Sequence, residues 1–203
     1  MEPLLLVGGS FNPVHHGHLI VSRFAAEQLG LVRVTLVPAS SPPHKRAVEL
    51  APAPDRLAMC RLVAAEDPLF TVSDCEIIRP GPNYTIDTIE HFRRQAAPDT
   101  PIYWLIGMDS LHELESWHRA AELVDRCTIV SVSRPGFEPP APMLLGRRFS
   151  QAQVDKLLAH MIEGPRIDIS GSEIRARVRA GRSIRYLVPE AVRRYIDQHR
   201  LYR

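Results

Sequence analysis

The chain has 203 residues, 45% of them hydrophobic, which is enough to bury one substantial core and predicts a single domain over residues 1–203. Lys and Arg number 25 against 23 Asp and Glu, so the net charge gives no reason to expect a nucleic-acid or membrane partner. Cys60, Cys75 and Cys127 lie too far apart for a metal knuckle or a disulfide framework, which favours a reducing compartment. With neither a signal-peptide core nor an apolar run of membrane-spanning length, we expect a cytoplasmic location.

Short apolar runs alternate with longer amphipathic stretches, as in parallel sheets that are buried on both faces and crossed by helices. The predicted strands are Pro3–Val7, Val32–Val37, Phe70–Ile77, Ile102–Ile106, Cys127–Ser131 and Arg166–Ile169. The predicted helices are, approximately, Gly17–Leu29, Pro54–Glu66, Thr85–Ala96, Ser110–Val124, Ser150–Met161, Ser172–Ala180 and Pro189–His199. This order predicts a doubly wound, mostly parallel α/β sheet with a helical C-terminal part over about residues 170–203.

Two proline-rich stretches interrupt the pattern and are predicted to be loops, Pro38–Pro54 and Ser133–Arg148. Ligands of open α/β sheets bind at the carboxyl ends of strands, where the first of these loops follows the second strand. Its Lys45 is one of only two lysines in the chain, which points to a compact ammonium at that place. A surface loop merely stiffened by proline is the alternative. The second loop and the oligomeric state are left open by the sequence.

The first predicted strand runs into Gly8-Gly9 and then into His15-His16-Gly17-His18 at the opening of a helix. Glycines let the main chain approach a phosphate closely, and a helix N-terminus adds N–H groups and the positive end of its dipole. The run matches neither the GxxxxGK[ST] phosphate loop nor the GxGxxG dinucleotide turn. His15 and His18 could both donate to one phosphate, although two ordinary histidines at a helix start are the alternative. The strand–turn–helix context favours phosphate chemistry of a different kind.

The run Gly8–Leu19 (GGSFNPVHHGHL) resembles the signature of the HxGH nucleotidyltransferases, which direct attack onto the α-phosphate of ATP. Ile169–Arg175 (ISGSEIR) resembles the late motif of that family, in which serines and an arginine at a helix N-terminus hold the ATP phosphates. A capping box would explain Ser170 and Glu173 without a ligand, but it explains neither Ser172 nor Arg175. Gly171 stands where the family usually has another hydroxyl residue.

Within that superfamily, essentially the whole chain resembles the bacterial nicotinate-mononucleotide adenylyltransferases. The matching segments are Ser41–Lys45, Pro82–Thr88, Ile106–Ser110 with Trp117, Arg134–Gly136, and Leu187–Val192 with Tyr195. The resemblance implies that ATP and nicotinate mononucleotide react to give nicotinate adenine dinucleotide and pyrophosphate, with Mg²⁺ accompanying ATP and no metal-ligand cluster in the protein. Two alternatives stay open: the same reaction on nicotinamide mononucleotide or phosphopantetheine, and a nucleotide-binding module without turnover.

The resemblance also implies three groups of site residues. The catalytic group is His15, His18, Lys45 and Arg175. The ATP-binding group is Gly9, Ser10, Phe11, His18, Gly107, Asp109, Ser170, Ser172 and Arg175. The mononucleotide-binding group is Ser40, Lys45, Tyr84, Thr85 and Trp117. Three of these residues have ordinary structural alternatives: Asp109 and Thr85 as helix caps, and Trp117 as part of the core.

Overall fold

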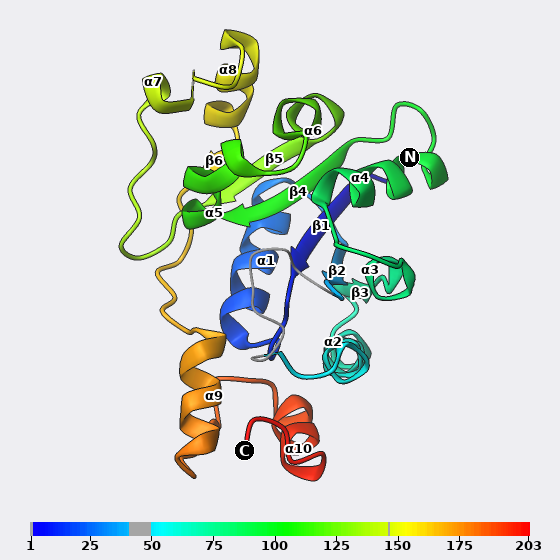
Figure 1. Cartoon of the computed structure of the whole chain (residues 1–203), viewed down its shortest axis with the longest axis vertical. Helices are drawn as coiled ribbons and strands as arrows, with labels where there is room; N and C mark the ends of the chain where they lie inside the picture. Colours follow the sequence, from blue (N-terminus) through cyan, green and yellow to red (C-terminus); the bar gives the residue numbers. More distant parts are fainter. Residues whose placement is uncertain (1, 41–49, 146) are drawn as a thin grey trace.

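A computed structural model describes residues 2–40, 50–145 and 147–203. Its centre is a parallel sheet with the strand order β3-β2-β1-β4-β5-β6 (Figure 1). The order reverses between β1 and β4, and this reversal is the topological switch point at which open α/β sheets bind ligands. The strands are β1 (Leu4–Gly9), β2 (Val34–Pro38), β3 (Phe70–Val72), β4 (Ile102–Gly107), β5 (Thr128–Val132) and β6 (Met161–Ile162).

Helices cover both faces of this sheet, which confirms the doubly wound α/β prediction. On one face lie α1 (His16–Gln28), α2 (Ala53–Glu66) and α10 (Glu190–Gln198). On the other lie α4 (Thr85–Gln95), α6 (Ala120–Arg126) and α8 (Gln151–Ala159). The remaining helices are α3 (Cys75–Ile78), α5 (Met108–Glu113), the 3-10 turn η2 (Leu114–Ser116), α7 (Pro142–Leu145) and α9 (Gly171–Arg179).

The alternation of side chains along β1 divides the buried residues into two clusters. Leu5 and Val7 pack with α1 and α2, whereas Leu6 packs with α4 on the opposite face. This is the period of two that a strand imposes on its side chains. The unbroken apolar run in the sequence follows from burial on both faces.

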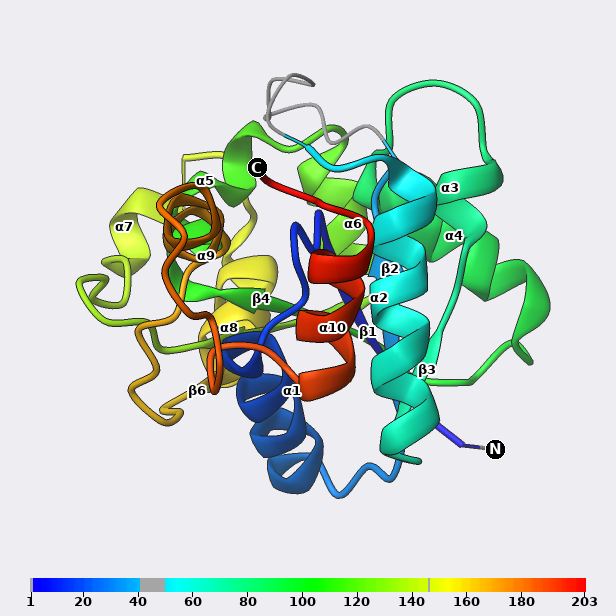
Figure 2. The same cartoon turned by 90° about the horizontal axis from the view of Figure 1, so that it is seen from below.

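The C-terminal helices share a core with the sheet. Ile174 of α9 and Val192 and Ile196 of α10 belong to the same buried cluster as β1 and α1. Figure 2 shows α10 between α1 and α2. The hydroxyl of Tyr195 donates to Oδ1 of Asp55 at 2.8 Å, so α10 is also tied to the start of α2 by a polar contact.

Two strand predictions need correction. The third strand ends at Val72 rather than Ile77, because the polar pair Ser73-Asp74 precedes the short helix α3: Asp74 is its N-cap residue, and Ser73 Oγ accepts from the N–H of Cys75. Arg166–Ile169 forms no strand among the described residues, and β6 occupies the place beside β5 instead. The chain leaves the sheet after Ile162, and Pro165 has no N–H with which to resume the pairing.

The helix predicted over Ser110–Val124 is also divided in the structure. It begins earlier, as α5 at Met108, and stops after η2, where Trp117 has an extended backbone. Arg119 then adopts a left-handed conformation, with φ 53° and ψ 42°, before α6 begins. The helix over Ser150–Met161 is confirmed in type but ends at Ala159, and the short α3 and α7 were not predicted.

No helix in the described part of the chain is both long enough and apolar enough to span a membrane.

Gly8 is the position in β1 where a side chain has least room. A Cβ built there would lie 2.2 Å from Cζ2 of Trp104 on β4, whereas one at Gly9 would lie 3.4 Å from the Phe11 ring. We expect Gly8→Ala to lower the free energy of unfolding by about 1–3 kcal/mol through overpacking. Gly9→Ala is the matched control and should cost less. Urea unfolding of both variants measures the difference, and equal losses would contradict the contact with Trp104.

Candidate functional site

The turn between β1 and α1 forms a cradle at the carboxyl end of the central strand. β1 ends at Gly9 and α1 begins at His16, with His15 as its N-cap residue. Phe11 has a φ of 43°, a conformation rare for a residue other than glycine and a form of strain that clusters at functional sites. Its ring is buried among the core residues, so any contact of Phe11 with a ligand would come from its main chain.

The two histidines of the HxGH run lie face to face. Their ring centroids are 3.6 Å apart with an interplanar angle of 24°. The main-chain N–H of His15 donates to Nδ1 of the His18 ring at 3.3 Å. Because Nδ1 of His18 accepts, the proton of the neutral ring is carried by Nε2. Gly17 leaves room for this stack, since a Cβ there would lie 3.0 Å from Nδ1 of His15.

A buried arginine that sequence reasoning missed holds the cradle in shape. Arg56 of α2 is 1% exposed, and its guanidinium donates to four main-chain oxygens. These are the carbonyls of Ser10 at 2.7 Å, Ala39 at 2.5 Å, Ser40 at 3.0 Å and Ala51 at 2.9 Å. The guanidinium therefore joins the turn after β1, the end of β2 and the segment before α2.

The late motif lies against the same turn. Ser170 is the N-cap of α9 and its Oγ accepts from the N–H of Glu173, which confirms the capping interaction of Ser170. Ser172 Oγ lies 3.2 Å from Ser170 Oγ. Nη1 of Arg175 donates to the carbonyl of Asn12 at 2.8 Å, although the two residues are 163 positions apart in sequence. The fold thus brings the early and late motifs into contact.

A second group of predicted residues gathers at the start of α4. Tyr84 is the N-cap of α4 and Thr85 its first residue, so the alternative in which Thr85 caps the helix is wrong. The ring of Tyr84 stacks on that of His118 at 4.3 Å, beside Trp117 in sequence. Trp117 is partly buried against the core under α4 and α6. A helix N-terminus leaves main-chain N–H groups for an anion at this place.

Buried polar contacts hold the start of α4 against α3. Oε1 of Glu76 accepts from Thr88 Oγ1, which in turn accepts from Nη2 of Arg79 at 3.1 Å. Nδ2 of Asn83 donates to the carbonyl of Glu76 at 3.0 Å. Burial raises the pKa of the Glu76 carboxyl, and the hydrogen bond from Thr88 opposes that shift. These contacts tie α3 to the first turns of α4.

The chain is similar to known proteins in a family model, in sequence and in fold. Residues 6–177 match the cytidylyltransferase-like family. A protein of Synechococcus sp. (strain JA-3-3Ab), named "Probable nicotinate-nucleotide adenylyltransferase", is 43% identical over 97% of this chain and 93% of its own. A protein of Thermus thermophilus with the same name is 42% identical over 98% of each chain. The solved structure of Plasmodium falciparum nicotinic acid mononucleotide adenylyltransferase complexed with NaAD has a TM-score of 0.77 at 18% identity, covering 100% of this chain and 98% of the other.

The chain belongs to the nicotinate-nucleotide adenylyltransferase family. Identities of about 40% over nearly the full length show the family, and the structural likeness at 18% identity shows the fold. The family resemblance expected from Gly8–Leu19 and Ile169–Arg175 is thereby confirmed.

The two remaining residues predicted for the ATP site lie at the end of β4 and in the first turn of α5. Gly107 ends β4, the strand paired with β1, so it lies at the same edge as Gly9. Asp109 lies in the first turn of α5, whose N-cap is Gly107, so the alternative in which Asp109 caps that helix is wrong. Its carboxylate Oδ2 is paired with Arg134. Both residues flank the switch point between β1 and β4.

Side-chain contacts join some of the predicted site residues, while others are related by the elements that carry them. Arg56 links Ser40 and Ser10, and Arg175 reaches the turn beside the two histidines. Lys45, with the matching segment Ser41–Lys45, lies outside the described residues. Arg56 carried one weak signal in the sequence: it has the helical spacing i, i+3, i+4 with Met59 and Cys60, which belong to the buried face of α2.

Arg56 should matter far more to stability than an arginine further along the same helix. We expect Arg56→Met to lower the free energy of unfolding by about 3 kcal/mol or more, because four carbonyls lose a charged donor. Arg61→Met removes an exposed ion pair with Asp74 and should change it by less than about 1 kcal/mol. Urea unfolding compares them, and a similar loss in both variants would refute the role of Arg56.

Proposed function

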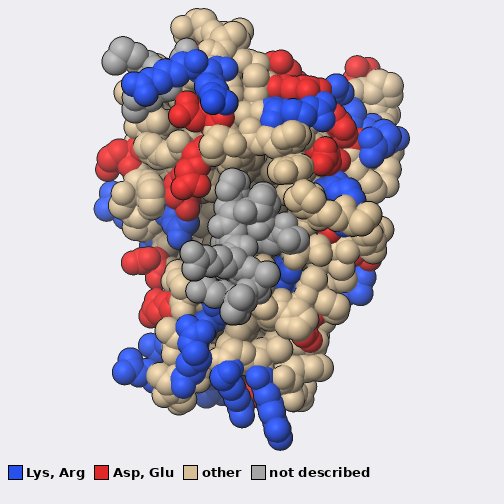
Figure 3. Space-filling model, in the orientation of Figure 1, with Lys and Arg blue, Asp and Glu red and all other residues tan. Residues whose placement is uncertain are grey.

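We propose that this chain transfers the adenylyl group of ATP to nicotinate mononucleotide, giving nicotinate adenine dinucleotide and pyrophosphate. The observation that carries the proposal is the cradle at the switch point, where the stacked His15 and His18 and the tethered Arg175 converge on one turn. The names of the full-length relatives support the same acceptor. Figure 3 shows Lys and Arg side chains gathered at the lower end of the molecule, where Figure 1 places α9 and α10, which suits a polyphosphate substrate.

In this reaction an oxygen of the mononucleotide phosphate bonds to the α-phosphorus of ATP. The bond from that phosphorus to the bridging oxygen of the β-phosphate breaks, and pyrophosphate leaves. The attacking phosphate is already an anion at neutral pH, so catalysis needs alignment and charge stabilisation rather than a strong base. We assign that stabilisation to His15 and His18 at the α-phosphate and to Lys45 and Arg175 at the departing pyrophosphate.

The other ATP contacts follow from the same placement. The main chain at Gly9, Ser10 and Phe11 and the hydroxyls of Ser170 and Ser172 would bind phosphate oxygens, as glycine turns and helix N-termini do. Gly107 and Asp109 would contact the ribose or base from the neighbouring strand. These three segments are separate in sequence: β1 and β4 are neighbours in the sheet, and α9 contacts the turn after β1 through Arg175.

The acceptor would bind on the α4 side of the switch point. The N–H groups at Tyr84 and Thr85 would hold the carboxylate of nicotinate, since both of its oxygens accept hydrogen bonds. Trp117 would contact the pyridine ring, and Ser40 and Lys45 would hold the mononucleotide phosphate. A carboxamide would place an NH₂ group against those N–H donors, and an unpaired buried donor discriminates strongly between substrates.

We further propose that Mg²⁺ arrives on the phosphates of ATP. The described residues contain no group of three or more His, Cys, Asp or Glu placed to hold a metal. Mg²⁺ keeps several water ligands and binds nucleotides through their phosphate oxygens, so it would come with ATP and would not need a dedicated protein cage. When bound, it would neutralise phosphate charge. We also propose that residues 1–203 act as one domain, supported by the core that α10 shares with β1. The cysteine pattern of the sequence supports a cytoplasmic location.

His18 should affect the rate much more than the binding of ATP. We expect His18→Ala to lower kcat by about 10²–10³-fold, since one donor to the transition state is lost, while KM for ATP changes only severalfold. His16→Ala is the matched control, because His16 lines a groove with Leu19 and Phe24 away from the stack. Steady-state pyrophosphate release measures both variants. A His18 variant with a kcat within about threefold of the parental value would rule out this role.

The acceptor assignment is tested with a panel of phosphate-bearing acceptors. We expect dinucleotide formation with nicotinate mononucleotide to have a kcat/KM at least about a hundredfold above that with nicotinamide mononucleotide or phosphopantetheine, because only the carboxylate pairs with the α4 donors. Pyrophosphate release is measured for each acceptor with saturating ATP. A ratio near one, or one favouring the amide, would reject nicotinate and leave adenylyl transfer intact. A chain that binds ATP without releasing pyrophosphate would be a binding module.

A further inference from the structure

Arg119 keeps a backbone conformation that glycine would adopt more easily. Its φ of 53° lies in the left-handed region, at the junction between Trp117 and α6. A side chain on Cβ makes that region unfavourable, whereas glycine enters it freely. Such a conformation persists where the surrounding structure holds the residue in place, and the contacts of the Arg119 side chain do so.

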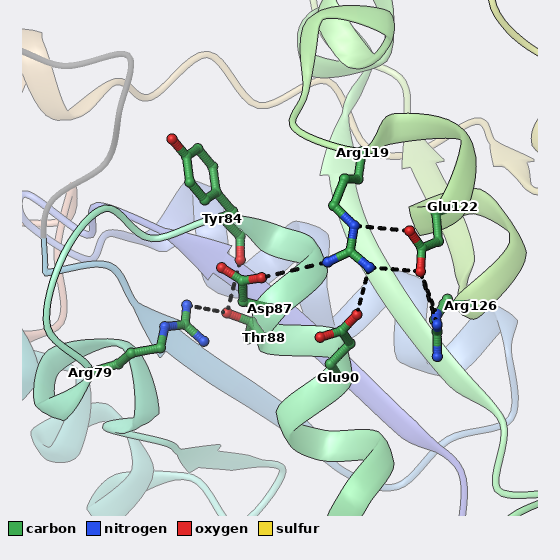
Figure 4. Close-up of polar contacts among 8 residues, drawn as sticks. All are labelled: Arg79, Tyr84, Asp87, Thr88, Glu90, Arg119, Glu122 and Arg126. Carbon is green, nitrogen blue, oxygen red and sulfur yellow. Dashed lines mark hydrogen bonds and ion pairs between the residues drawn. The ribbon is translucent and has the colours of Figure 1, made fainter.

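The guanidinium of Arg119 joins the start of α6 to the start of α4. It makes two hydrogen bonds to Glu122, from Nε at 2.9 Å and from Nη2 at 2.7 Å. Nη2 also donates to Oε1 of Glu90 at 3.0 Å, and Nη1 lies 4.0 Å from Oδ1 of Asp87. Figure 4 shows the three carboxylates turned toward this one cation. Asp87 and Glu90 belong to α4, and Glu122 to the first turn of α6.

A second contact connects the same two segments. The ring of His118, next to Arg119, stacks on that of Tyr84, the N-cap residue of α4. The segment from Trp117 to Arg119 is therefore held to the first turn of α4 by a ring stack and by a guanidinium. Trp117 itself packs against the core cluster that includes residues of α4 and α6.

The positive charge of Arg119 also lies close to Asp87. Asp87 lies in the first turn of α4, the turn whose N–H groups are proposed to hold the carboxylate of nicotinate. An unpaired carboxylate there would repel an anionic pyridine substituent, and Arg119 supplies the opposite charge. The four side chains are between 26% and 38% exposed, and ion pairs this exposed contribute little to global stability.

We propose that Arg119 is a positioning residue that determines acceptor specificity. It holds Trp117 and His118 against the start of α4 and compensates the charge of Asp87, so that this turn accepts a pyridine carboxylate. The inference rests on the proposed function, because it concerns the same acceptor site. It predicts that loss of the guanidinium penalises the anionic acceptor more than the amide.

The test compares Arg119→Ala with Arg126→Ala. Arg126 contacts the same Glu122, and within the described part of the chain its side chain forms no ion pair with α4. We expect Arg119→Ala to lower the nicotinate-to-nicotinamide ratio of kcat/KM about fivefold, the factor for two unit charges a few ångströms apart in a high dielectric. The change should appear in KM for nicotinate mononucleotide, with KM for ATP unchanged and Arg126→Ala like the parental chain. Adding Asp87→Asn to Arg119→Ala should recover the ratio.

Further variants separate this role from a structural one. Arg119→Gly relieves the left-handed backbone while removing the guanidinium, so it keeps the fold and should still lower the ratio. Equal losses of kcat/KM for both acceptors, or a lower melting temperature with an unchanged ratio, would overturn the proposal. If the parental chain forms no dinucleotide from nicotinate mononucleotide, the proposed function fails instead. The shift in melting temperature caused by each mononucleotide then still tests the role of Arg119 without turnover.

Discussion

The buried guanidinium of Arg56 is the interaction on which the shape of the site depends. It satisfies carbonyls from the turn after β1, from the end of β2 and from the segment before α2, and the Arg56 side chain itself is buried. Burying a charge is costly unless every donor finds an acceptor, so these three segments can pack only in the arrangement that supplies the acceptors. The cation also lies beneath a turn that is proposed to receive phosphate, where positive charge favours the ligand.

The two halves of the site use different devices to reach the same edge of the sheet. On the side proposed to bind ATP, Arg175 ties α9 to Asn12, and the stacked histidines lie at the start of α1. On the side proposed to bind the acceptor, Glu76 of α3 accepts from Thr88 of α4, and Arg119 joins α4 to α6. Rigid elements thus hold groups in place on both sides of the switch point, as a reaction that depends on alignment requires.

The structure contains the predicted elements whose signals lie within one short segment, and it departs from the prediction where contacts between distant segments decide. The β1 turn and α1 were predicted closely because their signals, an apolar run, paired glycines and a helix start, lie within one short segment. The strand expected at Arg166–Ile169 failed because its alternating pattern was real but the edge beside β5 was taken by Met161–Ile162. The break at Trp117 was missed because Arg119 holds a backbone conformation that nothing in the local sequence signals.

The sequence by itself determined the doubly wound fold class, the glycine turn between β1 and α1 and the family, because apolar periodicity and contiguous motifs are encoded by neighbouring residues. Only the tertiary structure decided that Arg56 would be buried under the cradle, that Arg175 would reach a carbonyl 163 positions earlier, and that His118 and Arg119 would meet α4. These contacts join segments far apart in the chain. Their partners are chosen by how helices and strands pack, which a linear pattern of residues does not specify.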